Sequence, residues 1–139
     1  MGTNIRAEVS KNNNYWIDKH RYYELKHFCL QYPIFKSAYN AVGMYNNKSV
    51  HSIMSKKQVT NDSAIDNIVE SRLYWRERMK LIEDAAMETD PVIGQYILKG
   101  VTEGFGYPYL KTRLNIPCCK DTYYQLYRKF FWILSKLRE

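Results

Sequence analysis

The chain has 139 residues, of which 45% are hydrophobic, and it carries a formal net charge of +7. This length holds one globular domain or two small helical subdomains, and it leaves no room for a catalytic domain beside a DNA-binding one. Positive charge is concentrated at both ends: residues 1–60 hold nine Lys or Arg against three acids, and residues 111–139 hold seven against two. This distribution favours an anionic partner, most commonly nucleic acid.

The cysteines and histidines give no sign of a metal or redox centre. Cys29, Cys118 and Cys119 form an odd count without zinc-binding spacing, so we expect reduced thiols in a cytoplasmic, nucleoid-associated protein. His20 and His27 share a helical spacing, which is more simply explained by an exposed helix face than by a metal site. No apolar run is long enough for a membrane helix. We therefore predict no enzymatic activity, no metal, no cofactor and no membrane partner.

The first part of the chain predicts two short helices between polar segments. Apolar residues recur at helical spacing from Trp16 to Tyr32, and Pro33 begins a second, shorter helix. Asn-rich and Lys-rich stretches flank this pair and predict irregular structure. The expected segments are a disordered basic arm (1–14), an N-terminal helical hairpin (15–45) and a loop or linker (46–62).

A long helix is predicted over residues 63–89. Its apolar positions alternate in steps of three and four, and the stripe includes Arg72 and Trp75. The stripe permits two interpretations: a coiled-coil seam that makes a homodimer, with Arg72 limiting its register, or a core-facing side packed on the N-terminal helices. Because the stripe is short, the sequence favours the second.

Residues 90–139 predict a helix-turn-helix domain. Asp90-Pro91 is a strong helix start, and Gly104 can end that helix in a left-handed conformation. Pro108 then begins a short helix, which Ile116-Pro117 ends, because a residue before proline avoids helical geometry. Three side chains of this short helix are available for a core: Tyr109, Leu110 and Leu114.

The final helix is expected to begin at Cys118–Asp121 and to run almost to the end of the chain. The complete prediction is an all-α fold with an N-terminal helical pair, a long linking helix and a C-terminal helix-turn-helix, whose last helix enters the major groove of DNA.

This final helix separates into an apolar side and a polar side. Amide, hydroxyl and guanidinium groups are the ones that reach base edges and phosphates, so Gln125 could read an adenine and Arg128 a guanine. The simpler alternative is the ordinary wet face of an amphipathic helix. Trp132 is the one large aromatic residue on the polar side, and with Arg72 and Trp75 it predicts a protein interface. The predicted DNA-binding residues are Lys111, Arg113, Lys120, Thr122, Gln125, Arg128 and Lys129.

The stretch from Leu81 to Arg138 resembles small prophage-encoded proteins of low-GC Gram-positive bacteria. These are related to phage late-transcription regulators of the ArpU and RinA type, and the resemblance is most specific at Val101-Thr102-Glu103-Gly104 and Ile116-Pro117-Cys118. It implies regulation of prophage transcription by a domain similar to region four of sigma factors, with recognition by Lys120 to Lys136 and RNA polymerase as a partner. Mobile elements also encode small basic excision factors that bind an integrase, and this role stays an alternative.

Overall fold

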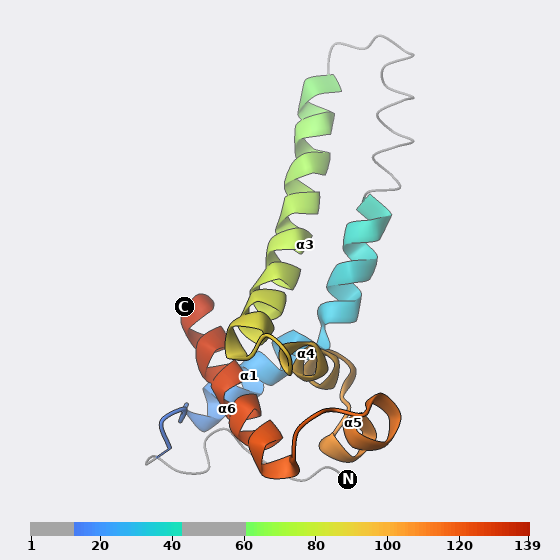
Figure 1. Ribbon diagram of the computed structural model, residues 1–139. Helices are drawn as coiled ribbons and strands as arrows, with labels where there is room; N and C mark the ends of the chain where they lie inside the picture. Colours follow the sequence, from blue (N-terminus) through green and yellow to red (C-terminus); the bar gives the residue numbers. More distant parts are fainter. Residues whose placement is uncertain (1–12, 43–60) are drawn as a thin grey trace. The chain divides into compact units, whose positions relative to one another are not determined.

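The computed structural model describes residues 13–42 and 61–139, and within them it holds helices and no strand (Figure 1). The all-α prediction is therefore confirmed for this part of the chain. None of the described helices is long and apolar enough to cross a membrane. The helices are α1 (Lys19–Leu30), an unlabelled helix over residues 32–42, α3 (Asn61–Thr89), α4 (Gly94–Glu103), α5 (Tyr107–Leu114) and α6 (Lys120–Leu137).

The chain forms two compact units. Unit 1 consists of Met1–Gln31 with Leu81–Glu139, and unit 2 consists of Tyr32–Lys80. The segment predicted as a helical hairpin thus divides between the units, because α1 packs against α4 and α6 whereas the 32–42 helix belongs to unit 2. Most of the predicted basic arm and linker, residues 1–12 and 46–60, lies outside the described residues.

The described chain begins with a turn and a helix cap where the sequence predicted the end of a disordered arm. The Asn13 side chain accepts a hydrogen bond from the Tyr15 N–H at 2.8 Å. Asp18 then has an extended backbone, and its carboxylate accepts from the His20 N–H at 2.9 Å. An N-cap in this conformation fixes the first helical residue, so α1 begins at Lys19, three residues after the predicted start at Trp16.

Unit 1 has an aromatic core organised around one side of α6. Tyr22 of α1 packs edge-on against Phe131 at 5.1 Å between ring centroids, and its hydroxyl lies 2.8 Å from that of Tyr127. Burial of such large rings is the main favourable contribution to a helical core of this size. The α6 side chains buried in this core are Tyr123, Tyr124, Phe130, Phe131, Ile133 and Leu134.

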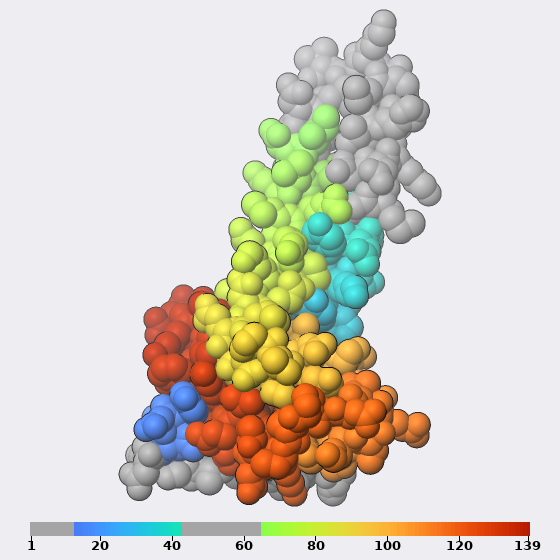
Figure 2. Space-filling model, in the orientation of Figure 1, coloured from blue at the N-terminus to red at the C-terminus, as the bar shows by residue number. Residues whose placement is uncertain are grey.

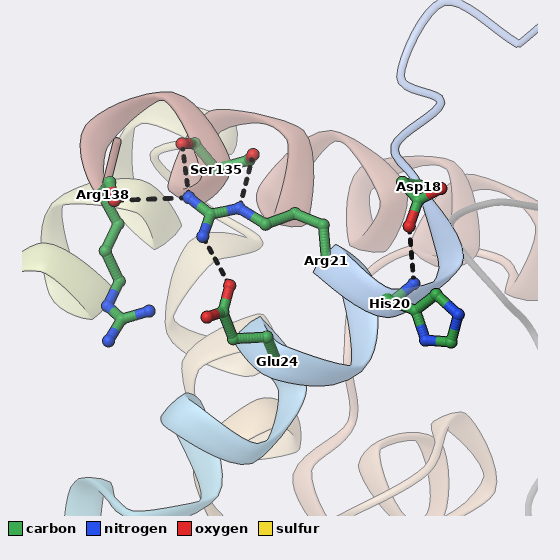
Figure 3. Close-up of polar contacts among 6 residues, drawn as sticks. All are labelled: Asp18, His20, Arg21, Glu24, Ser135 and Arg138. Carbon is green, nitrogen blue, oxygen red and sulfur yellow. Dashed lines mark hydrogen bonds and ion pairs between the residues drawn. The ribbon is translucent and has the colours of Figure 1, made fainter.

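Arg21 ties the start of α1 to the end of α6 (Figure 3). Its guanidinium donates to the Ser135 side chain at 3.1 Å, to the Ser135 carbonyl at 3.0 Å and to the Arg138 carbonyl at 3.3 Å, and it pairs with Glu24 at 2.6 Å. The last carbonyls of a helix have no intrahelical partner and carry partial negative charge, so a cation there is favourable. Two segments more than 110 residues apart in sequence are joined in this way.

Within unit 2, α3 packs against the 32–42 helix through the stripe that the sequence singled out. Trp75 stacks on Phe35 with ring centroids 5.9 Å apart, and the Arg72 guanidinium lies 4.5 Å from the centre of the Tyr39 ring. Arg72 and Trp75 thus contact the 32–42 helix of their own chain, and homodimerisation through the stripe stays a prediction.

Candidate nucleic-acid interface

The segment leading into α4 is held by Asp90. Its carboxylate accepts hydrogen bonds from the backbone N–H groups of Val92 and Ile93, both at 2.8 Å. These two bonds, that from Ile93 first, lower the pKa of Asp90, with a smaller contribution from the charge of Lys129. The sequence predicted that this helix starts at Pro91. Because residues 91–93 form a turn, α4 begins instead at Gly94.

The turns that separate α4, α5 and α6 are fixed by two residues with a positive φ. Gly104 has φ 78° and ends α4, and its N–H bonds to the Gly100 carbonyl at 2.9 Å. Asn115 has φ 52° and ends α5, after which the Ile116 N–H bonds to the Leu110 carbonyl at 3.1 Å. Ile116 is buried, so the turn before α6 is anchored by an apolar side chain. The positions of these turns agree with the sequence prediction.

α6 presents a polar face opposite its aromatic core side. Lys120, Thr122 and Gln125 are exposed on its first two turns, and Arg128 and Lys129 are half-buried on the third. Thr122, Gln125, Arg128 and Lys129 lie within about 120° of one another around the helix, and we call them the polar face of α6. Lys120 is the first residue of the helix and points about 200° from Thr122. All five belong to the predicted DNA-binding set, but the helix brings only the four residues of the polar face together on one side.

Two polar-face side chains, those of Thr122 and Arg128, make local contacts. The Thr122 hydroxyl lies 3.2 Å from the Cys119 sulfur, which precedes the helix as its N-cap. This side-chain hydrogen bond is the main reason that the pKa of the exposed Cys119 thiol is lowered. The Arg128 guanidinium makes a long hydrogen bond of 3.5 Å to the Tyr124 carbonyl of its own helix. Lys120 and Gln125 are exposed, and Gln125 bonds to no described residue.

The two predicted basic residues of α5 lie on different sides of that helix. Tyr107 faces α6, because its ring packs against Tyr123 and its hydroxyl donates to the Cys118 carbonyl at 2.7 Å. Lys111 follows Tyr107 by one turn on the same side, and its charge opposes the rise that burial causes in the pKa of Cys118. Lys111 therefore adjoins the start of α6, and the surfaces of α5 and α6 meet on the visible face of Figure 2.

Arg113 follows Tyr109 by one turn, and Tyr109 stacks on Phe105 with ring centroids 4.0 Å apart. At 3.6 residues per turn, Tyr109 and Tyr107 point about 200° apart around the helix. Arg113 therefore lies away from the polar face of α6, although the sequence grouped it with Lys111. Tyr109 is 41% exposed, so its assignment to the core was wrong, whereas Leu110 is fully buried as predicted. Leu114 is half-buried.

Trp132 lies on the same side of α6 as Gln125, is half-buried, and contacts two side chains of unit 1. The Tyr15 ring meets it edge-on at 5.4 Å, and the Lys136 ammonium lies 3.3 Å from its ring centre. The start of the described chain therefore lies against the second half of α6, as Figure 1 also shows. Periodicity identified Trp132 as an outlier on the polar side, but the segment that contacts it is 117 residues away in sequence.

Comparisons with protein-family models, curated proteins and solved structures found no match to this chain.

Proposed function

We propose that this protein binds double-stranded DNA through the polar face of α6 and regulates genes of a prophage or mobile element. The observation that carries the proposal is that the first two turns of α6 expose Lys120, Thr122 and Gln125, where a recognition helix meets base edges. The segment that ends at the start of α6 also supports DNA binding, since residues 104–120 hold three basic residues and no acidic one. Regulation of a mobile element is inferred from the resemblance of Leu81–Arg138 to prophage regulators.

The proposal assigns different roles to the amide and the ammonium groups. Gln125 would bond to a base edge in the major groove and so distinguish one sequence from another. Lys111, Lys120 and Lys129 would neutralise phosphates, which raises affinity for every sequence and makes binding depend on salt. Asp90 and Asp121 lie at the edge of this surface and oppose purely electrostatic binding.

The test is fluorescence anisotropy with a labelled duplex from the promoter or attachment region of the protein's own element. Affinity should fall steeply between 50 and 200 mM salt, a range over which several phosphate contacts lower binding by orders of magnitude. Lys120→Ala should weaken binding to all sequences and reduce the salt slope by about 1. Gln125→Ala should instead reduce the preference for the cognate duplex, by about 1–3 kcal/mol of discrimination.

Lys99→Ala is the matched control. Lys99 lies on α4, is exposed and pairs with Glu103 at 3.9 Å, so its removal changes the net charge by the same amount at a different place. Binding that ignores salt, or an equal loss with Lys99→Ala and Lys120→Ala, would overturn the proposal.

A second candidate is an excision factor or other accessory protein that acts mainly by binding a recombinase or RNA polymerase. The observation that favours it is the stacking of the exposed Tyr109 on the half-buried Phe105. Trp132 and Trp75 support it less, because each ring already contacts an aromatic side chain of the same chain. Capture of a purified integrase or polymerase that survives nuclease, without salt-dependent DNA binding, would favour this function over the first.

A further inference from the structure

Unit 1 carries an exposed apolar and aromatic patch at the corner between α4 and α5. Tyr109 is 41% exposed and stacks nearly parallel on the half-buried Phe105, with an angle of 22° between the ring planes. Leu30, the last residue of α1, is 38% exposed. Its Cδ2 atom lies 4.0 Å from the position that a Cβ atom on Gly104 would occupy, so Leu30 adjoins this corner. Arg113 follows Tyr109 by one turn and is exposed. We call Leu30, Phe105, Tyr109 and Arg113 the corner surface.

The corner surface faces away from the proposed DNA interface. The opposite side of α5 is occupied by Tyr107, which contacts α6, and by Lys111 beside it. A duplex bound along the polar face of α6 would therefore meet Lys111 and leave Tyr109 and Arg113 uncovered. This geometry separates the corner surface from nucleic-acid binding.

The composition of the corner surface is that of a protein-binding hot spot. Tyr and Arg are the residues most often found there, and a planar stacked pair loses little side-chain entropy when a partner covers it. Apolar groups exposed side by side with an arginine are best satisfied by a segment that offers both an apolar side chain and a carboxylate.

The positive charge around the corner surface favours an acidic partner over a second copy of this chain. Residues 104–119 contain no acidic residue, and Lys26 lies one turn before Leu30 on α1. The nearest acid in sequence, Glu103, pairs with Lys99. A second copy of the chain would bring the same cations together across a twofold contact, which is unfavourable for a protein of net charge +7.

We propose that the corner surface docks a protein partner through an acidic segment with an apolar anchor, which packs on the Phe105–Tyr109 stack while its carboxylate pairs with Arg113. This inference goes beyond the proposed DNA interface and does not depend on it.

The first step of the test is photo-crosslinking in cells with benzoylphenylalanine at position 109, and with the same probe at Gln95, an exposed position of α4, as the control. The expected result is a protein crosslink that is specific to position 109, survives nuclease, and maps by mass spectrometry to an acidic segment. A crosslink to DNA, a crosslink to a second copy of the chain, or no crosslink specific to position 109 would overturn the proposal.

The second step measures affinity for a synthetic peptide of the mapped segment. Tyr109→Ala and Arg113→Glu should each weaken binding at least tenfold, and exchanging the partner's acid for a lysine should restore binding to Arg113→Glu. Loss that a charge exchange does not rescue, or no loss, contradicts the proposed contact. DNA affinity of Tyr109→Ala is measured in parallel and should equal that of the unaltered chain. The failure of DNA binding and the failure of docking therefore give different results.

Discussion

Gly104 sets the direction in which the chain leaves α4. Its backbone conformation is unfavourable for any other amino acid at this position, so a substitution should reduce stability. At φ 78° an L side chain is strained, whereas the nearest atom to an added Cβ is 4.0 Å away, so space is not limiting. Gly104→Ala should therefore lower the free energy of unfolding by about 1 kcal/mol through conformation alone. Urea denaturation measures this difference.

Gly104→Asn is the control for that interpretation, because asparagine adopts the left-handed conformation more easily than alanine. Its effect should be smaller than that of Gly104→Ala. Equal losses with both substitutions would show that something other than the backbone conformation is responsible.

Asp90 makes the stability of unit 1 depend on pH. Its pKa is lowered in the folded chain by the hydrogen bonds from Ile93 and Val92, so its contribution is present above the unfolded pKa of about 3.9. The contribution is lost as pH falls through the lower folded pKa, where the carboxylate is protonated. Asp90→Ala should cost about 1 kcal/mol at pH 7, the usual effect of removing such a cap.

The measurement is chemical denaturation of the unaltered chain and of Asp90→Ala from pH 7 to pH 2. The difference between the two should shrink below about pH 4. A constant difference over the whole range would mean that the ionised carboxylate is not what stabilises the turn.

At the scale of elements, α1 and α6 are joined by a pair of tyrosine hydroxyls. Those of Tyr22 and Tyr127 lie 2.8 Å apart, and burial raises the pKa of Tyr127 well above its usual range, so the Tyr127 hydroxyl stays neutral. Replacing one tyrosine by phenylalanine leaves the other hydroxyl without this partner. We expect each single substitution to cost about 1–2 kcal/mol, and the double substitution to cost less than the sum.

A double-mutant cycle with thermal or urea unfolding measures this coupling. Tyr23→Phe is the control on the same helix, since Tyr23 is half-buried and the loss should be below about 0.5 kcal/mol. Strict additivity of the Tyr22 and Tyr127 substitutions would contradict a direct interaction.

The sequence predicts where the helices of this protein begin and end better than it predicts which residues pack against them. Turn residues act locally, so Gly104, Asn115 and Pro117 mark the ends of α4 and α5 without knowledge of the rest of the chain. Helical periodicity likewise shows which side of α6 is apolar. Neither signal reveals which residues pack against a given side of a helix. Tyr22 pairs with Tyr127, and Tyr15 with Trp132, and each pair joins residues more than 100 positions apart in sequence.

The candidate site shows the same limit. A pattern of basic residues brought Lys111 and Arg113 together because they are two positions apart in sequence. Two positions on a helix point in nearly opposite directions, and only the contacts of Tyr107 and Tyr109 show which of the two adjoins α6. The corner surface was missed for a related reason, since Tyr109 fits a core pattern but stacks on Phe105 at the surface.

At the scale of the whole molecule, unit 1 is built from two distant parts of the chain. α1 supplies four buried side chains to it, those of Tyr22, Leu25, Phe28 and Cys29. A fragment of residues 81–139 would lack them and expose a broad apolar surface. We expect this fragment to have reduced helicity and no cooperative unfolding transition, because a core of this size has little stability to spare.

Adding a peptide of residues 13–31 to the fragment should restore helicity at a one-to-one ratio, as circular dichroism can measure. A peptide carrying Arg21→Ala is the control and should complement less well, because it lacks the bonds to Ser135 and Arg138. A fragment that unfolds cooperatively by itself would show that α1 is not part of its core.

The joining of α1 to α6 also sets an order of events during synthesis. α1 is synthesised more than 90 residues before Phe130 and Phe131, so the first helix of unit 1 lacks its α6 partner until translation has passed the end of α6. A nascent chain interrupted before that point has neither the aromatic core nor the polar face of α6. Truncated products are then substrates for proteolysis and not competitors for the proposed DNA site.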